Sequence, residues 1–303
     1  MEITLDNVAL VDSEAALRAS HAFGALQTGT KQLDDLLAPA FDQAKGTAKK
    51  VPGLPATGGI LPGMLHLIAG PQRLLSRVLM RTAVMALLPP EQGGVNASRV
   101  FYAEFNNDFD PYFVSHVAME KALTPARVLD RVEIARGFTW DQAVENVARL
   151  LPDKVAAEAR PVVIVSGLTS LFDPRDRSHF DGLREMLAGV KRCLRTPPVF
   201  LLASTPIADG SVFKPRGGHL LYHVAACMFA VSEPRETRSG RRVNEWVLVR
   251  HPALPERTIQ CWSDPPAPKH VPGRKGRARQ DAMLATRTLD DFVTGDRLAK
   301  KQW

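Results

Sequence analysis

The pattern of apolar and polar positions divides most of the chain into short strand-like runs separated by longer helix-like stretches. The run VVIV at 162–165 is apolar at every position, which favours a parallel strand buried on both faces. Residues 74–88 predict a helix that ends before Pro89 and Pro90, because proline cannot continue a helix. Strands and helices alternate in this way for about 200 residues after Gly63, so we expect an α/β fold with a mainly parallel sheet flanked by helices.

The expected elements follow one another along the chain. Strands are predicted at 64–69, 99–105, 132–135, 161–165 and 198–203. Helices are predicted at 28–37 (a turn and a short helix), 74–88, 111–123, 140–151 and 181–194, with a short helix after Gly218. Three further strands, at 225–232, 243–250 and 257–262, are expected to be antiparallel and to close the sheet at the C-terminal end of the core.

Composition suggests three regions of different character. Residues 1–26 predict an N-terminal helix (13–21) and a linker, and residues 27–264 a core with a loop insertion at 39–58, which is rich in Pro, Gly, Ala and Lys. Residues 265–303 predict a basic, partly disordered tail with one short helix at 288–293.

The overall composition excludes several classes of protein. The chain of 303 residues is 45% hydrophobic and 23% charged, which excludes wholesale disorder, collagen and coiled coil. It shows no membrane-spanning run and no secretion signal, and its three cysteines form no CxxC pair. We therefore expect a soluble intracellular protein with reduced thiols and no membrane partner.

Charge is concentrated at the C-terminal end. Residues 265–303 hold nine Lys and Arg against four Asp, whereas the rest of the chain is nearly neutral. An acidic partner such as DNA would then be contacted mainly by the tail or by a few loops. The candidates in the tail for phosphate contact are Lys269, Arg274, Lys275, Arg277 and Arg279. A flexible solubilising tail or a nuclear-import signal is the alternative.

A series of short motifs resembles one known family. In order, they are TGTKQLDDLL (28–37), GGILPG (58–63), GPQRLLSR (70–77), RVFYAEF (99–105), FDP (109–111), EIARGFTWDQ (133–142), VVIVSGLTSLF (162–172), KPRGGHLLYH (214–223) and HPALPE (251–256). Together they resemble the RecA/RadA-type strand-exchange recombinases of the archaeal–eukaryotic branch. The resemblance implies a RecA-like fold over residues 27–262 and a role in DNA recombination, in the nucleus of a eukaryote or in the cytoplasm or nucleoid of a prokaryote.

The phosphate loop of that family is altered here. A working loop has the pattern GxxxxGK[ST], in which lysine neutralises the phosphates and the hydroxyl binds magnesium. Gly70 is retained, but Leu75, Ser76 and Arg77 replace the second glycine, the lysine and the hydroxyl residue. Leu75 adds a Cβ atom where the loop needs none, and the guanidinium of Arg77 cannot bind magnesium.

Two acidic positions of the family are also lost. The residue that orients magnesium corresponds to Ser166, and the water-activating glutamate corresponds to Asn106, which cannot act as a base. Glu104, two residues earlier on the same strand face, is a less favoured alternative base. We therefore expect a pseudo-ATPase that binds neither ATP nor magnesium. The remnant is either a plain strand–helix turn, with Arg73 and Arg77 in solvent, or an anion site formed by Arg73, Ser76 and Arg77.

Two loops of the family hold single-stranded DNA. Their counterparts here are 173–181, with Arg175 and Arg177, and 206–218, with Phe213, Lys214 and Arg216. The first loop also contains Asp173, Asp176 and Asp181, so weak DNA contact and an ordinary solvated loop both remain open.

The resemblance assigns His223 and Arg250 a role on a neighbour. His223 matches a histidine that approaches the nucleotide phosphate of the adjacent subunit, and Arg250 replaces the family's nucleotide-capping acid. Both could act in trans on a partner's ATP. His219 and His223 have the spacing of a metal pair, but the sequence offers no third ligand, so no metal is expected.

Self-assembly signals are weak. Active members of the family carry an N-terminal helix–hairpin–helix domain and a Phe-x-x-Ala motif that inserts into the neighbour, and the nearest match here is Phe23-Gly24-Ala25-Leu26. We therefore predict a non-catalytic recombinase paralogue that pairs with another recombinase-family subunit and binds DNA weakly. The alternatives are a DNA-dependent ATPase with an atypical phosphate loop and a RecA-like regulatory scaffold with no DNA role.

Overall fold

The computed structural model describes residues 24–39, 41–42, 47–48, 58–195, 199–237 and 242–263. The predicted helices at 13–21 and 288–293, Phe23 and the five basic tail residues lie outside these ranges. The division of the chain into linker, core and tail therefore stays a prediction.

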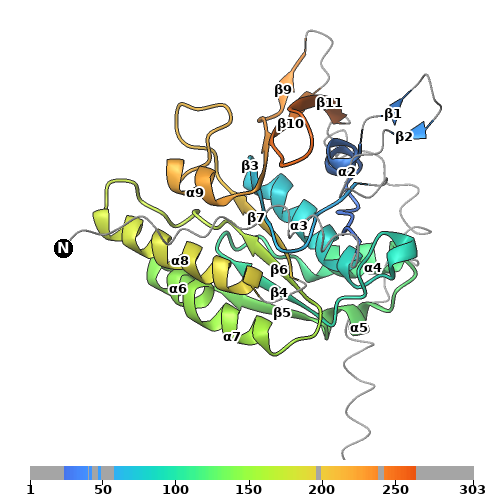
Figure 1. The fold of residues 1–303 in the computed structure, drawn as a ribbon, viewed down its shortest axis with the longest axis horizontal. Coiled ribbons are helices and arrows are strands. Elements are labelled where there is room, and N and C mark those ends of the chain that lie inside the picture. The colour runs from blue at the N-terminus through green and yellow to red at the C-terminus, as the bar shows by residue number, and fades with distance from the viewer. Residues whose placement is uncertain are drawn as a thin grey trace, which may run out of the picture. The chain divides into compact units, whose positions relative to one another are not determined.

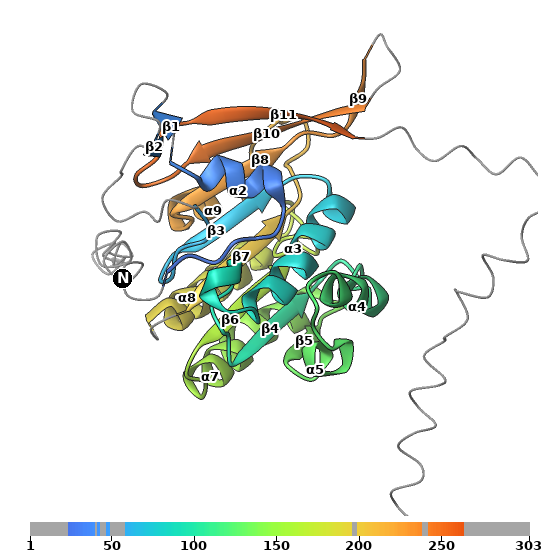
Figure 2. The same cartoon turned by 90° about the vertical axis from the view of Figure 1, so that its right-hand side faces the viewer.

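Within the described residues, a nine-stranded sheet forms the centre of the fold (Figures 1 and 2). Its order is β11-β10-β8-β3-β7-β6-β4-β5, with β9 (Arg235–Glu236) paired to β10. Neighbours from β8 to β5 are parallel, and β10 and β11 add antiparallel strands at the other end. The bounds are β3 (Leu65–Ala69), β4 (Arg99–Glu104), β5 (Val132–Arg136), β6 (Pro161–Ser166), β7 (Phe200–Thr205), β8 (Cys227–Val231), β10 (Arg242–Arg250) and β11 (Arg257–Ser263).

Helices cover both faces of the sheet (Figure 2). One face carries α2 (Lys31–Leu37), α3 (Gln72–Ala86), α4 (Pro111–Glu120) and α5 (Pro125–Leu129), and a 3₁₀ turn at Pro90–Gln92 follows α3. The other face carries α6 (Trp140–Glu145), a π-helical turn (Asn146–Leu150), α7 (Leu151–Ala156), α8 (Arg177–Arg195) and α9 (Gly218–Val224).

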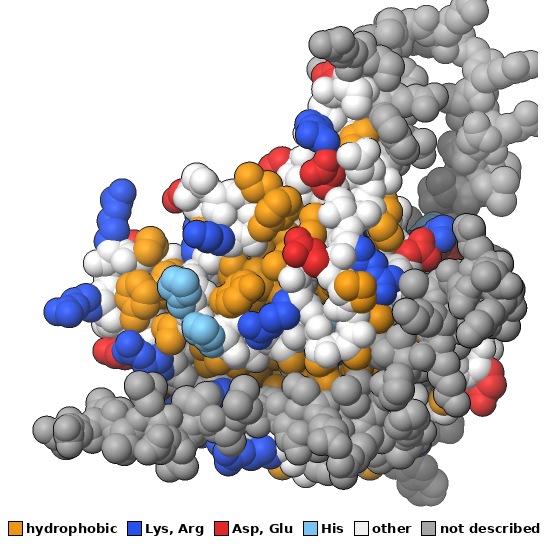
Figure 3. All heavy atoms as spheres, turned by 45° about the horizontal axis from the view of Figure 1, so that its top comes forward, with side chains coloured by type: hydrophobic (Ala, Val, Ile, Leu, Met, Phe, Trp, Pro, Cys, Tyr) orange, Lys and Arg blue, Asp and Glu red, His pale blue; other side chains and the backbone are white. Residues whose placement is uncertain are grey.

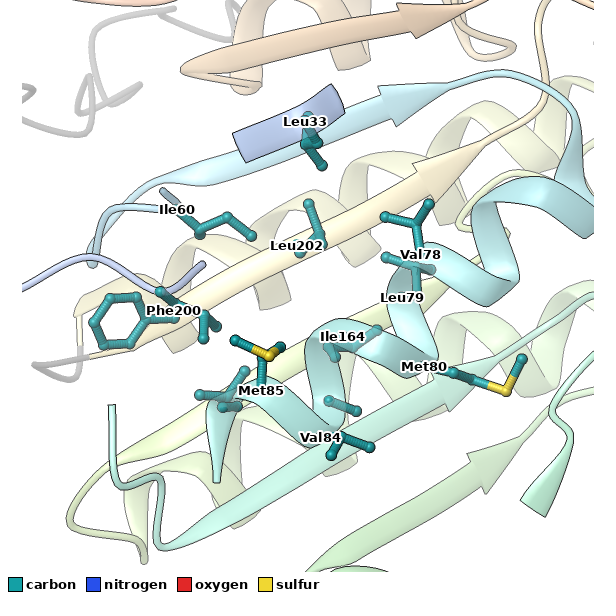
Figure 4. Close-up of a cluster of buried hydrophobic side chains, with 14 of the residues drawn as sticks. Leu33, Ile60, Val78, Leu79, Met80, Val84, Met85, Ile164, Phe200 and Leu202 are labelled. Atoms are coloured by element: carbon teal, nitrogen blue, oxygen red, sulfur yellow. The ribbon is translucent and has the colours of Figure 1, made fainter. Parts of the chain in front are cut away.

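Each face has its own hydrophobic core. Alternate residues of the central strands point to opposite sides: Ile164 of β6 packs with α3, and Val163 and Val165 pack with α8. Figure 4 shows part of the first core, where Leu79 and Val84 of α3 lie over the sheet. Because both faces are buried, the central strands are apolar throughout, as their sequence predicted.

The predicted α/β class, with parallel strands first and antiparallel strands last, is confirmed. Within the predicted loop insertion at 39–58, Phe41–Asp42 (β1) and Thr47–Ala48 (β2) form a small antiparallel pair. The helix predicted at 111–123 ends at Glu120, because Ala122 adopts a left-handed backbone conformation, with φ 57°, and α5 follows as a separate helix.

Two other helices differ from their predicted bounds. The helix expected at 140–151 continues to Ala156 through the π-helical turn that precedes Pro152, where Arg192 donates to the carbonyl of Ala148. The helix expected to begin at 181 begins at Arg177, because the Asp176 carboxylate accepts the N–H of Ser178 (2.9 Å). Arg177 was therefore wrongly placed in a loop.

The three cysteines lie within the described residues. Cys193 and Cys227 are buried and Cys261 is half-buried, and all three are free. Within the described ranges, no helix combines the length and the apolar character needed to cross a membrane.

Two buried histidines lie where β3 begins and β10 ends. His66 is fully buried, and its Nε2 accepts the N–H of Leu61 (3.3 Å). His251 is 8% exposed, and its Nδ1 accepts the N–H groups of Ala253 and Leu254 (3.1 Å each). Burial lowers the pKa of His66 to about 3, with a further contribution from His251. Burial, followed by the charge of Arg257, lowers the pKa of His251 to about 4.

This burial makes the fold sensitive to acid. Both imidazoles stay neutral in the folded protein, whereas the unfolded chain takes up protons below about pH 6.5, so the free energy of unfolding falls as pH decreases from there toward pH 4. We expect each histidine to account for a loss of about 2 kcal/mol between pH 7 and pH 5. In urea unfolding, His251→Asn should remove about half of this pH dependence, and exposed His219→Asn should leave it unchanged. An undiminished pH dependence in His251→Asn would contradict this account.

Candidate nucleotide site and DNA-facing surface

The segment that corresponds to the phosphate loop is mostly helical. After β3 only Gly70 and Pro71 intervene before α3 begins at Gln72, and the N–H of Leu75 donates to the carbonyl of Pro71 (3.0 Å). Residues 75–77 therefore lie inside the helix, where backbone N–H groups bond to the preceding turn. A phosphate nest needs several consecutive N–H groups that are free to face the anion.

Gly70 has a packing reason to be glycine. A Cβ atom there would lie 2.9 Å from the carbonyl oxygen of Val231 and 3.0 Å from the Val231 Cβ atom, on the adjacent strand β8. Its N–H donates to the carbonyl of Thr205 (3.1 Å). The glycine of the family motif is thus explained here by strand packing alone.

The side chain of Asn106 is fully hydrogen-bonded. Its Nδ2 donates to Gln72 Oε1 (2.9 Å) and Ser166 Oγ (3.2 Å), and its Oδ1 accepts from Ser170 Oγ (2.7 Å). Gln72 Nε2 in turn donates to the carbonyl of Gly70 (3.0 Å). The ends of β3, β4 and β6 are therefore tied together by neutral side chains, which we call the amide–hydroxyl network: Gln72, Asn106, Ser166 and Ser170.

The network requires a glycine beside it. Gly167 has φ +75°, and a Cβ atom there would lie 1.5 Å from Oδ1 of Asn106. Any side chain at this position would collide with the network and would be strained in backbone conformation as well.

Two carboxylates lie near the network. Asp108 Oδ2 is 3.4 Å from Ser76 Oγ, which places a negative charge beside the position of the family's lysine. Glu104 is 1% exposed; its Oε1 accepts the N–H groups of Asp108 and Phe109, and its Oε2 lies 3.2 Å from Arg136 Nε. Glu104 therefore holds the loop after β4, and the alternative of a shifted catalytic base stays a prediction.

The first two arginines of α3 point outward. Arg73 and Arg77 are exposed, and the guanidinium of Arg77 lies 5.9 Å from the ring centroid of Phe113 on α4. Of the candidate anion ligands, Arg73, Ser76 and Arg77, only the buried Ser76 thus belongs to the polar interior, where Asp108 is its neighbour.

The first DNA-loop candidate is held by its own acids. Asp173 Oδ1 accepts the N–H of Arg175 (2.9 Å), Asp176 caps α8, and the His179 ring stacks on Trp140 at 4.9 Å. Arg175 and Arg177 are exposed beside these carboxylates.

The second DNA-loop candidate is a compact turn. Ala208 N–H donates to the carbonyl of Lys214 (2.8 Å), and Arg216 forms an ion pair with Asp209 (3.4 Å). Lys214 is exposed, and Phe213 is half-buried.

The turn and α9 enclose a pocket of about 350 Å³. It is lined by Lys214, Pro215, Gly218, His219, Tyr222 and His223. The rings of His219 and His223 lie 6.1 Å apart, and the guanidinium of Arg250 is 5.0 Å from the Tyr222 ring. Figure 3 shows histidines next to hydrophobic side chains on this face, with Lys and Arg around them. The structure thus brings His223 and Arg250, far apart in sequence, close to the same Tyr222 ring.

Sequence reasoning located the altered positions but missed their partners. Gln72, Asp108 and Ser170 complete the network and its surroundings; the first and last lie within the quoted motifs at positions that were given no role, and Asp108 lies outside them. Only the strand order, which brings three carboxyl ends to one edge, could have indicated them.

Comparisons with known proteins agree with the fold and the motifs. A family model described as Rad51 matches residues 21–195, more than half of the chain. The chain is 25% identical over 240 residues to "DNA repair and recombination protein RadA" of Metallosphaera sedula (71% of this chain, 71% of that protein). It is 25% identical over 252 residues to "DNA repair protein RAD51" of Mycosarcoma maydis (76% and 65%) and 26% identical over 222 residues to "DNA repair protein RAD51 homolog 1" of Arabidopsis thaliana (66% and 61%). It thus spans less than two thirds of the length of the last two.

The amide–hydroxyl network should contribute to stability. Asn106→Ala leaves Gln72 Oε1 and the hydroxyls of Ser166 and Ser170 without their partner, so we expect a loss of about 1–3 kcal/mol in the free energy of unfolding. Urea denaturation measures this loss. The matched control is Gln92→Ala, which truncates an exposed amide and should change stability by less than about 0.5 kcal/mol. Equal effects of the two substitutions would mean that the network is not structural.

Proposed function

The chain belongs to the Rad51 family, and on that premise we propose that it is a non-catalytic accessory subunit of homologous recombination and DNA repair. In this proposal it binds a recombinase-family partner and DNA, and it neither binds nor hydrolyses ATP. The relatives to which it is similar are DNA repair and recombination proteins by name.

The start of α3 at Gln72 carries the proposal. With residues 72–77 helical, the N–H groups of Leu75, Ser76 and Arg77 bond within the helix, and only those of its first turn, residues 72–74, have no intrahelical acceptor. A triphosphate would require unwinding of the first turn of α3 without a lysine to compensate for the phosphate charge. The carboxylate of Asp108 beside Ser76 would oppose the anion further.

In this proposal, the chain also lacks the general base and the magnesium-orienting acid that ATP hydrolysis needs. A carboxamide at Asn106 cannot take a proton from water, and both of its ends are already hydrogen-bonded. The hydroxyl of Ser166 is neutral, so it supplies no negative charge that would orient a hydrated magnesium ion. The altered positions therefore support a loss of function that no single substitution would reverse.

DNA contact is proposed for the pocket face of α9 and the second loop, together with the tail. Lys214 and Arg216 supply positive charge there, and Phe213 and Tyr222 supply aromatic surface of the kind on which bases stack. The same face holds His223 and Arg250, for which we propose the action in trans on a partner's nucleotide. The first loop, with three aspartates beside Arg175 and Arg177, is the weaker candidate.

The partner is proposed to dock on the edge strand β5. Within the described ranges, β5 pairs only with β4, so its outer edge is open to another strand. A cavity of about 50 Å³ beside it is lined by Phe101, Ala103, Ala135, Leu150 and Leu151, with the Glu133–Lys154 ion pair at its rim. Ile134, Phe138 and Leu150 are exposed apolar residues next to this edge. We propose that the partner adds a strand to this edge and packs an apolar side chain, as the Phe-x-x-Ala motif of the family would, against these exposed residues.

The first test is nucleotide and DNA binding by the same preparation. In calorimetry with and without magnesium, ATP should show no binding up to about 1 mM, and a mobility shift of DNA should appear without nucleotide and be unchanged by it. Turnover that Arg73→Ala abolishes would instead establish an ATPase with an atypical loop. Absence of any DNA shift at low salt, with no recombinase partner in a pull-down, would favour the regulatory scaffold.

The second test concerns the partner. Leu150→Glu places a charge in the apolar cavity, and we expect it to weaken binding to a cognate Rad51-family recombinase at least tenfold in a pull-down or biolayer assay. Met119→Glu is the matched control, because Met119 is 60% exposed on α4, on the other face of the sheet. Equal binding by both variants would exclude this edge as the docking site.

A further inference from the structure

A groove of about 520 Å³ lies between α6 and α8, on the face of the sheet opposite α3. It is separate from the phosphate-loop segment and from the α9 pocket. It is lined by Trp140, Val144 and Gly182 together with polar and charged side chains. Neither the family motifs nor the proposed DNA surface explains it.

The walls of the groove are strongly acidic. Four lining side chains are carboxylates from the two helices, Asp141 and Glu145 of α6 and Asp181 and Glu185 of α8. The single lining cation, Arg149, already pairs with Glu145 (2.7 Å) and lies 3.8 Å from Glu185. At the other end Asp181 pairs only with the exposed Arg184, and Asp141 has no ion-pair partner among the described residues. This excess of negative charge contrasts with the formal net charge of the whole chain, which is +7.

A buried donor provides a second, independent observation. Trp140 is 7% exposed, and in the described part of the chain its indole Nε1 has no hydrogen-bond partner. A Cβ atom on Gly182 would lie 2.6 Å from this nitrogen, so the indole nitrogen lies between α6 and α8, where Trp140 and Gly182 both line the groove. An unpaired buried donor is costly, and an acceptor supplied by a ligand would satisfy it.

Charge and donor together define the ligand. Within the described ranges, no three of His, Cys, Asp and Glu approach closely enough to hold one metal ion, so the carboxylates are too widely spread for a metal site. A polyamine would match the carboxylates but has no acceptor for the indole N–H. A peptide segment offers both, because Lys and Arg side chains are cations and the backbone carbonyl is an acceptor. The groove volume falls in the range of ordinary ligand sites.

We infer that the groove between α6 and α8 is a docking site for a Lys- or Arg-bearing peptide segment of a partner protein. The cationic side chains pair with Asp141 and Asp181, and a backbone carbonyl accepts the Trp140 N–H. The site is distinct from the nucleic-acid surface, because its carboxylates repel phosphate. It is equally distinct from the β5 edge, where the proposed contact is apolar.

The test uses the full chain and a fluorescent acetylated and amidated peptide, Arg-Gly-Arg-Gly-Arg, with binding followed by anisotropy. The double variant D141N/D181N should weaken binding at least tenfold. The charge-matched control D153N/E91Q removes two exposed carboxylates outside the groove and should bind like the unmodified protein. When the competitors are compared at equal concentrations of positive charge, spermine should compete at least tenfold less well than the unlabelled peptide.

A variant of the indole tests the donor separately. Trp140→Phe keeps an aromatic ring but removes the N–H, and it should weaken peptide binding several-fold while spermine binding stays unchanged. Absence of peptide binding, equal losses in D141N/D181N and D153N/E91Q, or equal competition by spermine would each overturn the proposal. A failure here leaves nucleotide, DNA and β5-edge binding untouched, because those assays involve other residues.

Discussion

Beyond its first turn, a helix bonds each backbone N–H group to a carbonyl one turn earlier, and this constraint on Leu75, Ser76 and Arg77 governs the character of the site. In a phosphate loop the chain stays uncoiled long enough for several N–H groups to face an anion. Here Pro71, with φ −61° and ψ 118°, precedes a helix that begins at once, and the N–H of Leu75 is taken by Pro71 itself. Substituting side chains at 75–77 alone would therefore not recreate a nest, since the backbone donors would still be engaged.

The residues around this turn form a consistent set. Where a nucleotide site would hold a lysine and two acids, this chain has Ser76, Asn106 and Ser166, whose hydroxyls and amide bond to one another at the ends of β3, β4 and β6. The side chain of Asn106 packs directly against Gly167, where the Cβ atom of any other residue would collide with its Oδ1 atom. Buried polar groups stabilise a fold only when they are paired, so such a network contributes to packing at these strand ends.

The parts of the fold that the sequence predicted are those set by local pattern. Strand β6 was recognisable because burial on both faces makes it apolar throughout, and the end of α3 because Pro89 and Pro90 follow it. The parts that it did not predict depend on distant partners. At the π-helical turn, Arg192, more than 40 positions away in sequence, donates to the carbonyl of Ala148. The break between α4 and α5 depends on the left-handed backbone of Ala122, which has no strong sequence signal because alanine rarely adopts that conformation. In the site, Leu75 to Arg77 could be identified by motif, but Ser170 and Gln72 became partners of Asn106 only through the strand order.

Charge distinguishes the groove between α6 and α8 from the pocket beside α9, although these helices cover the same face of the sheet, and this bears on how a polyanion could approach. On the side of α6 and α8, the carboxylates at 141, 145, 181 and 185 add negative charge to the helix that begins with Arg177, which reduces the attraction of this arginine for phosphate. On the side of α9, Lys214 and Arg250 stand beside aromatic rings, with Asp209 held by Arg216. Salt screens charges that are far from a bound nucleic acid, so its attraction depends on the cations nearest to it. On the DNA-binding proposal, a nucleic acid would therefore contact the α9 pocket, with Lys214 and Arg250, before the acidic groove. In the proposals above, the groove stays available to a cationic partner when the α9 pocket is occupied, because the two linings share no residue.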